Sequence, residues 1–204
     1  MFLVKLFSKL PGWFIYGLAE VNAFFIYYIF KYRRAVVREN LVNSFPTKTL
    51  TQIKSIEKKY YQNLLRIFYE SIYSYGFTKP DWQKRITIEN PELLTNILDN
   101  GTPVILMSGH FNNWEWAGSS ISTLIDYPFE FMYKPMKNEK FGSLMRDLRQ
   151  KHWNNFVNQE TAFYVGAERI ASLVVYSVYY MECERVKNGK YNIRFTEISN
   201  PPDD

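Results

Sequence analysis

Hydrophobic and polar positions divide the chain into an apolar first segment and a longer part that changes between helical and extended patterns. Residues 11–30, PGWFIYGLAEVNAFFIYYIF, are apolar except for Glu20 and Asn22. As one helix they extend about 30 Å, which is the thickness of a bilayer core. A glutamate is unfavourable in hydrocarbon, so a helix lying in the membrane interface with Glu20 turned to water is the alternative. Both readings predict membrane attachment, which the pattern favours over a buried core helix.

The next segment has the spacing of an amphipathic helix. Within residues 51–75, apolar side chains recur every three or four positions, at Ile53, Ile56, Tyr60, Leu64, Ile67 and Ile72. This period predicts one long helix with a single apolar face.

From residue 85 onward, short apolar runs alternate with helical patterns. Strands are predicted at RITIEN (85–90), PVILM (103–107) and FEFMYK (129–134), and helices at 91–100, 113–125 and 139–150. The helix after residue 90 is expected to be capped by Asn90 and to stop near Asn100-Gly101. Asn188-Gly189 predicts a hairpin between the last two strands. The alternation predicts an α/β fold with a mixed, partly parallel sheet flanked by helices.

The pattern suggests two regions. Residues 1–46 form an N-terminal membrane-associated segment with a basic flank, and residues 47–204 form the α/β domain. The excess of Lys and Arg in residues 31–38, just after the apolar segment, places the following domain on the cytoplasmic side if the helix spans.

Composition narrows the class of partner. Aromatic residues make up 18% of the chain, as expected of a protein at a membrane interface, and the net charge of +5 favours an acidic partner. The chain has no glycine-rich phosphate loop, RNA-binding aromatic motif or zinc-finger spacing, which argues against nucleic acid. Its single cysteine, Cys183, excludes an intramolecular disulfide and a CxxC metal site.

The candidate chemistry lies in SGHFNNWEW, residues 108–116, directly after the PVILM strand. In α/β sheets, ligands gather where strands end and helices begin. His110 lies there and is the side chain best placed by pKa to accept a proton near neutrality. Glu115 could accept a hydrogen bond from the other imidazole nitrogen and so orient the ring. His110 and Glu115 together could activate a substrate hydroxyl.

The same residues also fit a helix cap. Asn112 or Asn113 could begin the helix, with Glu115 reaching back to the Asn112 N–H. Spacing alone does not decide between catalysis and capping, and one residue can serve both.

Several blocks of the chain, in order, resemble one family. GHFNNWEW looks like the His-x4-Glu/Asp motif of the bacterial lipid A biosynthesis acyltransferases, the late lauroyl and myristoyl transferases. Similar blocks are YRRAVVRENLVNSFP (32–46), ENPELLTNILDNG (89–101), YKPMKNEKF (133–141) and NFVNQETAFYVGAERIA (155–171). The resemblance covers nearly all of the chain.

The resemblance implies an inner-membrane enzyme that moves a fatty acyl chain from acyl carrier protein to a hydroxyl of a lipid A precursor. It implies no cofactor and no metal, with His110 as general base and Glu115 as its partner. Lys134 matches a family position associated with polar substrate, and Arg146 and Arg149 are weaker phosphate-contact candidates that also fit a solvated basic surface. Asn113 is a further substrate-binding candidate, although it and Trp114 are expected to shape the motif turn more than to take part in the chemistry. An acceptor that is a lysophospholipid or an aminolipid is the alternative.

Two departures from the family bear on activity. The resemblance leads one to expect a further helix and strand between Arg149 and His152, where the chain instead runs straight on, and family C-terminal helices after ISNPPDD. An inactive, shortened, membrane-bound relative is therefore the alternative of a different class.

Two other kinds of chemistry are disfavoured by the sequence. His152 stands in a loop-like stretch, and a metal site with His110 would need more ligands than the spacing offers. The serines lack a nucleophile-elbow motif, which argues against a serine hydrolase.

Overall fold

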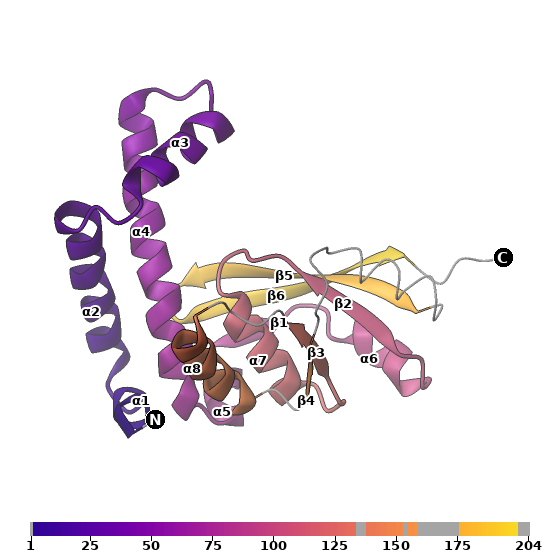
Figure 1. Cartoon of the computed structure of the whole chain (residues 1–204). Coiled ribbons are helices and arrows are strands. Elements are labelled where there is room, and N and C mark those ends of the chain that lie inside the picture. The colour runs from indigo at the N-terminus through magenta and orange to yellow at the C-terminus, as the bar shows by residue number, and fades with distance from the viewer. Residues whose placement is uncertain (1, 134–137, 153–154, 159–175, 200–204) are drawn as a thin grey trace. The chain divides into compact units, whose positions relative to one another are not determined.

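The computed structural model describes residues 2–133, 138–152, 155–158 and 176–199 (Figure 1). By compactness the chain divides into residues 1–76, here the N-terminal unit, and residues 77–204, here the α/β unit.

The N-terminal unit is helical throughout its described part. Its elements are α1 (Phe2–Phe7), α2 (Gly12–Phe24), a π-helical turn η1 (Phe25–Ile29), α3 (Arg34–Ser44), α4 (Leu50–Tyr73) and a 3-10 turn η2 (Ser74–Gly76). The long amphipathic helix predicted at 51–75 is confirmed as α4. It begins with a capping box in which Thr49 accepts from the Gln52 backbone N–H and the Gln52 side chain accepts from that of Thr49.

Helix α2 continues through η1, so residues 12–29 form one helical stretch that packs along α4 (Figure 1). Among the described residues, no single helix is long and apolar enough to cross a membrane. Gly12–Ile29 and Arg34–Ser44 together reach that length and composition, but they meet at an angle of 93°. The predicted membrane attachment stays a prediction.

The α/β unit contains a four-stranded sheet and a two-stranded sheet. Its elements are α5 (Lys79–Gln83), β1 (Ile86–Ile88), α6 (Glu92–Asp99), β2 (Val104–Ser108), α7 (Trp114–Leu124), β3 (Glu130–Tyr133), α8 (Glu139–Gln150), β4 (Asn155–Asn158), β5 (Ser177–Lys187) and β6 (Lys190–Ser199). The larger sheet has the order β1-β6-β5-β2, with β1/β6 and β2/β5 parallel and β5/β6 antiparallel. The predicted mixed α/β sheet flanked by helices is confirmed.

The predicted hairpin is confirmed at the β5–β6 connection. Lys187 pairs with Lys190 across a two-residue turn, and Gly189 has φ +69°, a conformation that glycine adopts without strain. Helix α6 ends at the predicted stop, with Asn100 at its last turn.

The predicted Asn90 cap is wrong. Helix α6 is preceded by Pro91 as its capping residue, without a side-chain hydrogen bond. The Asn90 amide instead bonds to strand β6, accepting from the Phe195 N–H at 2.9 Å and donating to the Phe195 carbonyl at 2.8 Å. The side chain therefore fixes the end of β1 to the sheet.

An aromatic cluster forms the core of the α/β unit between the sheet and its helices. Trp82 of α5 and Trp116 of α7 are fully buried, with ring centroids 5.6 Å apart, and Trp116 packs at the same distance against Tyr191 of β6. Because Trp116 is two residues after the start of α7, this packing fixes the beginning of that helix against the sheet.

Candidate functional site

The turn between β2 and α7 carries the candidate motif, and its helix cap is made by Asn113. The Asn113 Oδ1 accepts the Trp116 backbone N–H at 3.0 Å, and the whole side chain is buried. The proposed cap by Glu115 is wrong, because Trp116 occupies the third helical position and Glu115 the second. The carboxylate of Glu115 is thus released from capping.

Strand β5 holds the same turn from the side. Ser108 donates to the Met181 carbonyl at 3.2 Å, and the Asn112 amide donates to the Cys183 carbonyl at 2.8 Å. Asn112 has φ +49°, a left-handed conformation that asparagine tolerates better than most residues. A Cβ atom at Gly109 would lie 3.0 Å from the Tyr180 hydroxyl oxygen, so this position favours glycine. These hydrogen bonds and backbone conformations together fix the path of the turn.

His110 is exposed at the surface of this turn, next to Phe111, whose side chain is 68% exposed. Its imidazole packs against the Trp114 ring with centroids 4.5 Å apart and an angle of 55° between the planes. A substrate can therefore reach the imidazole, and contact with the indole limits the orientations of the imidazole ring.

Glu115 forms a buried, bidentate ion pair with Arg149. The Arg149 Nε donates to Oε2 at 3.0 Å, Nη2 donates to Oε1 at 2.5 Å, and each residue is only 7% exposed. Glu115 lies in the first turn of α7 and Arg149 in the last turn of α8, where the helix dipoles favour a negative and a positive charge respectively. Two parallel charge-assisted hydrogen bonds hold the carboxylate in one orientation.

Trp114 connects this ion pair to His110. The guanidinium carbon of Arg149 lies 5.1 Å from the Trp114 ring centroid, within the range of a cation–π contact. His110, Trp114, Arg149 and Glu115 thus form one continuous cluster, here the motif cluster.

The predicted hydrogen bond between His110 and Glu115 stays a prediction. In the part of the chain that the structure describes, Glu115 is paired with Arg149 and His110 with Trp114. A carboxylate has about four lone-pair sites, so the pairing with Arg149 leaves capacity for another donor.

The remaining candidates have different surroundings. Arg146 is exposed on α8, and Lys134 lies outside the described residues. The interpretation of Arg149 as a solvated surface cation is wrong, because its side chain is buried against Glu115 and Trp114. Among the described residues, no group of three or more His, Cys, Asp or Glu side chains is placed to hold a metal ion.

The sequence did not predict two structural roles in the motif cluster. Trp114 connects His110 to the ion pair, and Arg149 is the partner of Glu115. A signal for Arg149 is present in the helical spacing of α8. Met145 and Leu148 are buried, and Arg149 follows Met145 by four residues, so it belongs to the same face of the helix. An arginine on a buried face requires an acidic partner.

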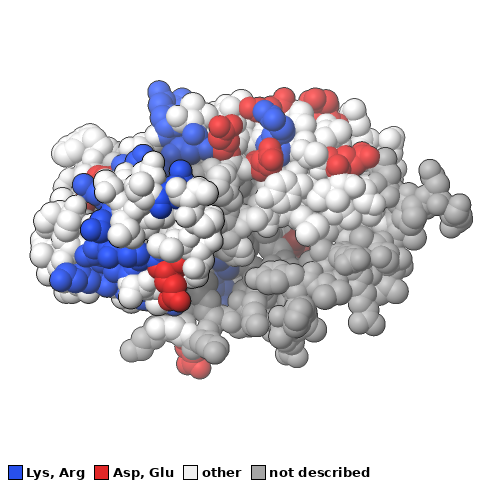
Figure 2. Space-filling model, turned by 90° about the horizontal axis from the view of Figure 1, so that it is seen from above, with Lys and Arg blue, Asp and Glu red and all other residues white. Residues whose placement is uncertain are grey.

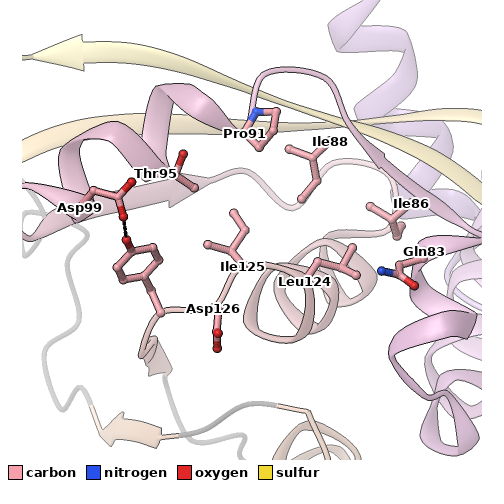
Figure 3. A pocket seen from close by; sticks show the side chains of 10 residues that line it. Gln83, Ile86, Ile88, Pro91, Thr95, Asp99, Leu124, Ile125 and Asp126 are labelled. Carbon is pink, nitrogen blue, oxygen red and sulfur yellow. Dashed lines mark hydrogen bonds between the residues drawn. The ribbon is translucent and has the colours of Figure 1, made fainter.

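A pocket of about 510 Å³ lies elsewhere in the α/β unit (Figure 3). It is lined by Gln83, Ile86, Ile88, Pro91, Thr95, Asp99, Leu124, Ile125, Asp126 and Tyr127, and the Tyr127 hydroxyl bonds to Asp99. Leu124 is the last residue of α7, whereas the motif cluster surrounds its first turn. At 1.5 Å per residue the two ends are about 15 Å apart, so the pocket is separate from the motif cluster.

Comparison with known proteins gives one family match. Residues 1–189 match the family described as bacterial lipid A biosynthesis acyltransferase, which covers most of the chain and all four residues of the motif cluster. No curated protein matches the chain.

Proposed function

Because the chain belongs to the bacterial lipid A biosynthesis acyltransferase family, we propose that it transfers a fatty acyl chain from acyl carrier protein to a hydroxyl of a lipid A precursor. Family membership implies an acyltransferase with an acyl donor and a lipid acceptor. The carrier protein as donor and the roles of individual residues are the finer parts of the proposal. The observation that supports them is an exposed His110 on a fixed turn, joined through Trp114 to the buried Glu115–Arg149 pair.

In the proposed reaction His110 is the general base. Its free imidazole nitrogen accepts the proton of the acceptor hydroxyl while the hydroxyl oxygen attacks the thioester carbonyl of the acyl carrier. The tetrahedral intermediate then collapses to the ester and expels the carrier thiolate, which takes the proton from the imidazolium. One C–O bond forms, one C–S bond breaks, and the enzyme returns to its starting state.

The rest of the motif cluster stabilises this cycle through charge and position. The carboxylate of Glu115 stabilises the imidazolium, and the two hydrogen bonds from Arg149 hold that carboxylate in one orientation. The positive end of the α7 dipole lies at the same turn and favours the oxyanion of the tetrahedral intermediate.

Charge and location complete the proposal. A net charge of +5 complements an acidic carrier protein and the phosphates of a lipid A precursor, for which Lys134 and Arg146 remain candidates. We place the enzyme at the bacterial inner membrane with the α/β unit on the cytoplasmic side, where acyl carrier protein is found.

The proposal is tested by acyl transfer from carrier protein loaded with a labelled fatty acid to a lipid A precursor. His110→Ala is expected to lower the transfer rate by about 10²- to 10⁴-fold, the usual contribution of a general base. The matched control is His152→Gln, because the half-buried His152 ring packs edge-on against Trp82, with ring centroids 5.3 Å apart, and has no proposed chemical role.

Each other outcome has a meaning. Equal rates for wild type and folded His110→Ala would refute the general-base role. Transfer to a lysophospholipid or an aminolipid, but not to the lipid A precursor, would assign the alternative acceptor. No transfer to any of the three by folded wild-type protein would indicate an inactive relative.

A further inference from the structure

The N-terminal helix has two faces of different character. Ile15, Ala19, Ala23 and Tyr27 recur every four residues and are buried, and Ala19 and Ala23 pack against Leu65 of α4. The other side of α2 and η1 is exposed. This aromatic face consists of Trp13, Phe14, Val21, Phe24, Phe25, Tyr28 and Ile29, and Trp13 is 75% exposed.

The aromatic face carries no charge. The one charged side chain of residues 12–30 is Glu20, and it is turned to α4, where it accepts from Gln62 at 2.8 Å and from the Arg66 Nε at 2.7 Å. The charge that opposes membrane burial is therefore paired with side chains of α4, although Glu20 lies one helical turn before Phe24 at the border of the aromatic face.

Contact with α4 also decides how α2 can meet a bilayer. The two helices lie side by side (Figure 1), joined by the alanine contacts and by the Glu20 hydrogen bonds. Helix α4 carries exposed Lys54, Lys58 and Lys59. If α2 crossed the bilayer in this arrangement, α4 would enter hydrocarbon with it, and charges at that depth are strongly unfavourable.

The 93° bend after η1 is fixed by buried charge. Arg34 and Arg38 of α3 each donate at 2.9 Å to Glu57 of α4, whose side chain is fully buried. The Tyr61 hydroxyl donates to the Tyr32 carbonyl at 2.5 Å, within the bend itself. Straightening α2 and α3 into one span would break these bonds and leave a buried carboxylate unpaired.

Cations flank the aromatic face at both of its ends. Lys5 and Lys9 precede α2, and Lys31 and Arg33 stand in the bend, all four exposed. Figure 2 looks down on the α3 end of the N-terminal unit and shows Lys and Arg side chains gathered there. Aromatic rings with basic residues beside them match the headgroup layer of an anionic bilayer.

We propose that the N-terminal unit is a monotopic membrane anchor. The aromatic face of α2 and η1 lies in the headgroup layer, with the helix axis in the membrane plane, the flanking cations on anionic headgroups and α4 on the water side. This deepens the proposed membrane location by naming the surface and its orientation, and it is independent of the acyl-transfer chemistry.

The orientation is tested with the full chain by labelling single cysteines. Lys9→Cys precedes α2 and Glu39→Cys follows the bend; both positions are exposed, and the buried natural Cys183 makes the unsubstituted chain the unlabelled control. A membrane-impermeant maleimide is applied to inverted inner-membrane vesicles and to intact spheroplasts. In-plane attachment predicts that both cysteines react in inverted vesicles and neither reacts in spheroplasts.

Reaction of the two cysteines from opposite sides of the membrane would overturn the in-plane orientation and establish a span. Recovery of the folded chain in the soluble fraction alone would overturn the anchor itself. Neither result depends on acyl transfer, so failure of the anchor and failure of the enzymatic proposal are distinguishable.

The surface is tested by flotation with vesicles of phosphatidylethanolamine and phosphatidylglycerol. The double variant Phe24→Ser/Phe25→Ser is expected to lower the ratio of bound to free protein by about tenfold or more, because two half-exposed rings lose apolar burial. Val186→Ser/Ile198→Ser is the matched control, since these side chains are similarly exposed but lie on the β5–β6 hairpin. Equal binding by the two double variants would overturn the assignment of the face, with circular dichroism confirming that both are folded.

Discussion

Removal of the Arg149 guanidinium is the sharpest perturbation of the motif cluster. Both oxygens of Glu115 accept from this one side chain, and each partner is 7% exposed. Arg149→Met keeps an apolar stem against Trp114 and leaves the carboxylate buried without its cation. Breaking a buried pair in this way costs about 3–5 kcal/mol, so we expect the free energy of unfolding of the α/β unit to fall by that amount.

The double variant Glu115→Gln/Arg149→Met separates the charge pair from the packing. It has no buried unpaired charge, so it is expected to be more stable than Arg149→Met despite carrying one more substitution. A coupling energy of about 2–3 kcal/mol is expected from the cycle of the two single variants and the double variant.

Urea unfolding followed by tryptophan fluorescence measures these energies, because Trp82 and Trp116 are buried in the α/β unit and report on its unfolding. A cost below about 1 kcal/mol for Arg149→Met, or additivity of the two single variants within about 0.5 kcal/mol, would refute the buried pair. The rate of acyl transfer by the double variant then tests whether Glu115 has a catalytic role in addition to its effect on stability. If Glu115 stabilises the imidazolium, the stable double variant remains impaired in transfer, whereas a purely structural pair predicts recovery.

Three further changes test other contacts. Glu57→Gln removes the buried negative charge that pairs with two arginines and replaces one of its acceptor oxygens with an NH2 donor. It is expected to lower the stability of the N-terminal unit by about 3 kcal/mol, measured by urea unfolding; exposed Lys59→Gln should have almost no effect. Asn113→Ala removes the α7 cap and should cost about 1 kcal/mol, with Asn113→Asp restoring most of it if capping is the cause. Burial and the hydrogen bond to Glu197 raise the pKa of Tyr179 to about 12. Because this exceeds the ordinary value of about 10, the associated stability is complete below pH 10 and is lost as pH rises through 12; the stability of Tyr179→Phe should fall less steeply over that range.

The elements that sequence predicted best are those decided by neighbouring residues. Helix α8 has the predicted bounds of 139–150, because apolar spacing and the Asn138 cap both act within a few residues. The β5–β6 turn follows from Asn188-Gly189 for the same reason. Residue types within a few positions were enough to predict an element wherever no distant side chain or strand competed for the same hydrogen bonds.

Side-chain partners distant in sequence were not predictable in this way. Asn90 is of a residue type that often caps helices, and it stands just before α6. Its side-chain amide instead pairs with the backbone N–H and carbonyl of Phe195, 105 residues later. The residue type and position of Glu115 fit a capping residue or a partner of His110, but its carboxylate bonds to Arg149, 34 residues away. In both cases the packing of one element on another decides the partner, and single-sequence spacing contains no information on that packing.

The path of the motif turn depends on β5 more than on the segment after Arg149, where the sequence leads one to expect a departure from the family. Ser108 is the register partner of Met181, and its hydroxyl bonds to that residue's carbonyl; after β2 ends, Asn112 bonds to the Cys183 carbonyl two residues further along β5. The turn thus continues to follow β5 until α7 begins. The helix and strand expected between Arg149 and His152 would be inserted after the last turn of α8, beyond the residue that binds Glu115. The described contacts of His110, Trp114, Glu115 and Arg149 therefore form without that segment, which supports the proposed acyltransferase over the inactive relative.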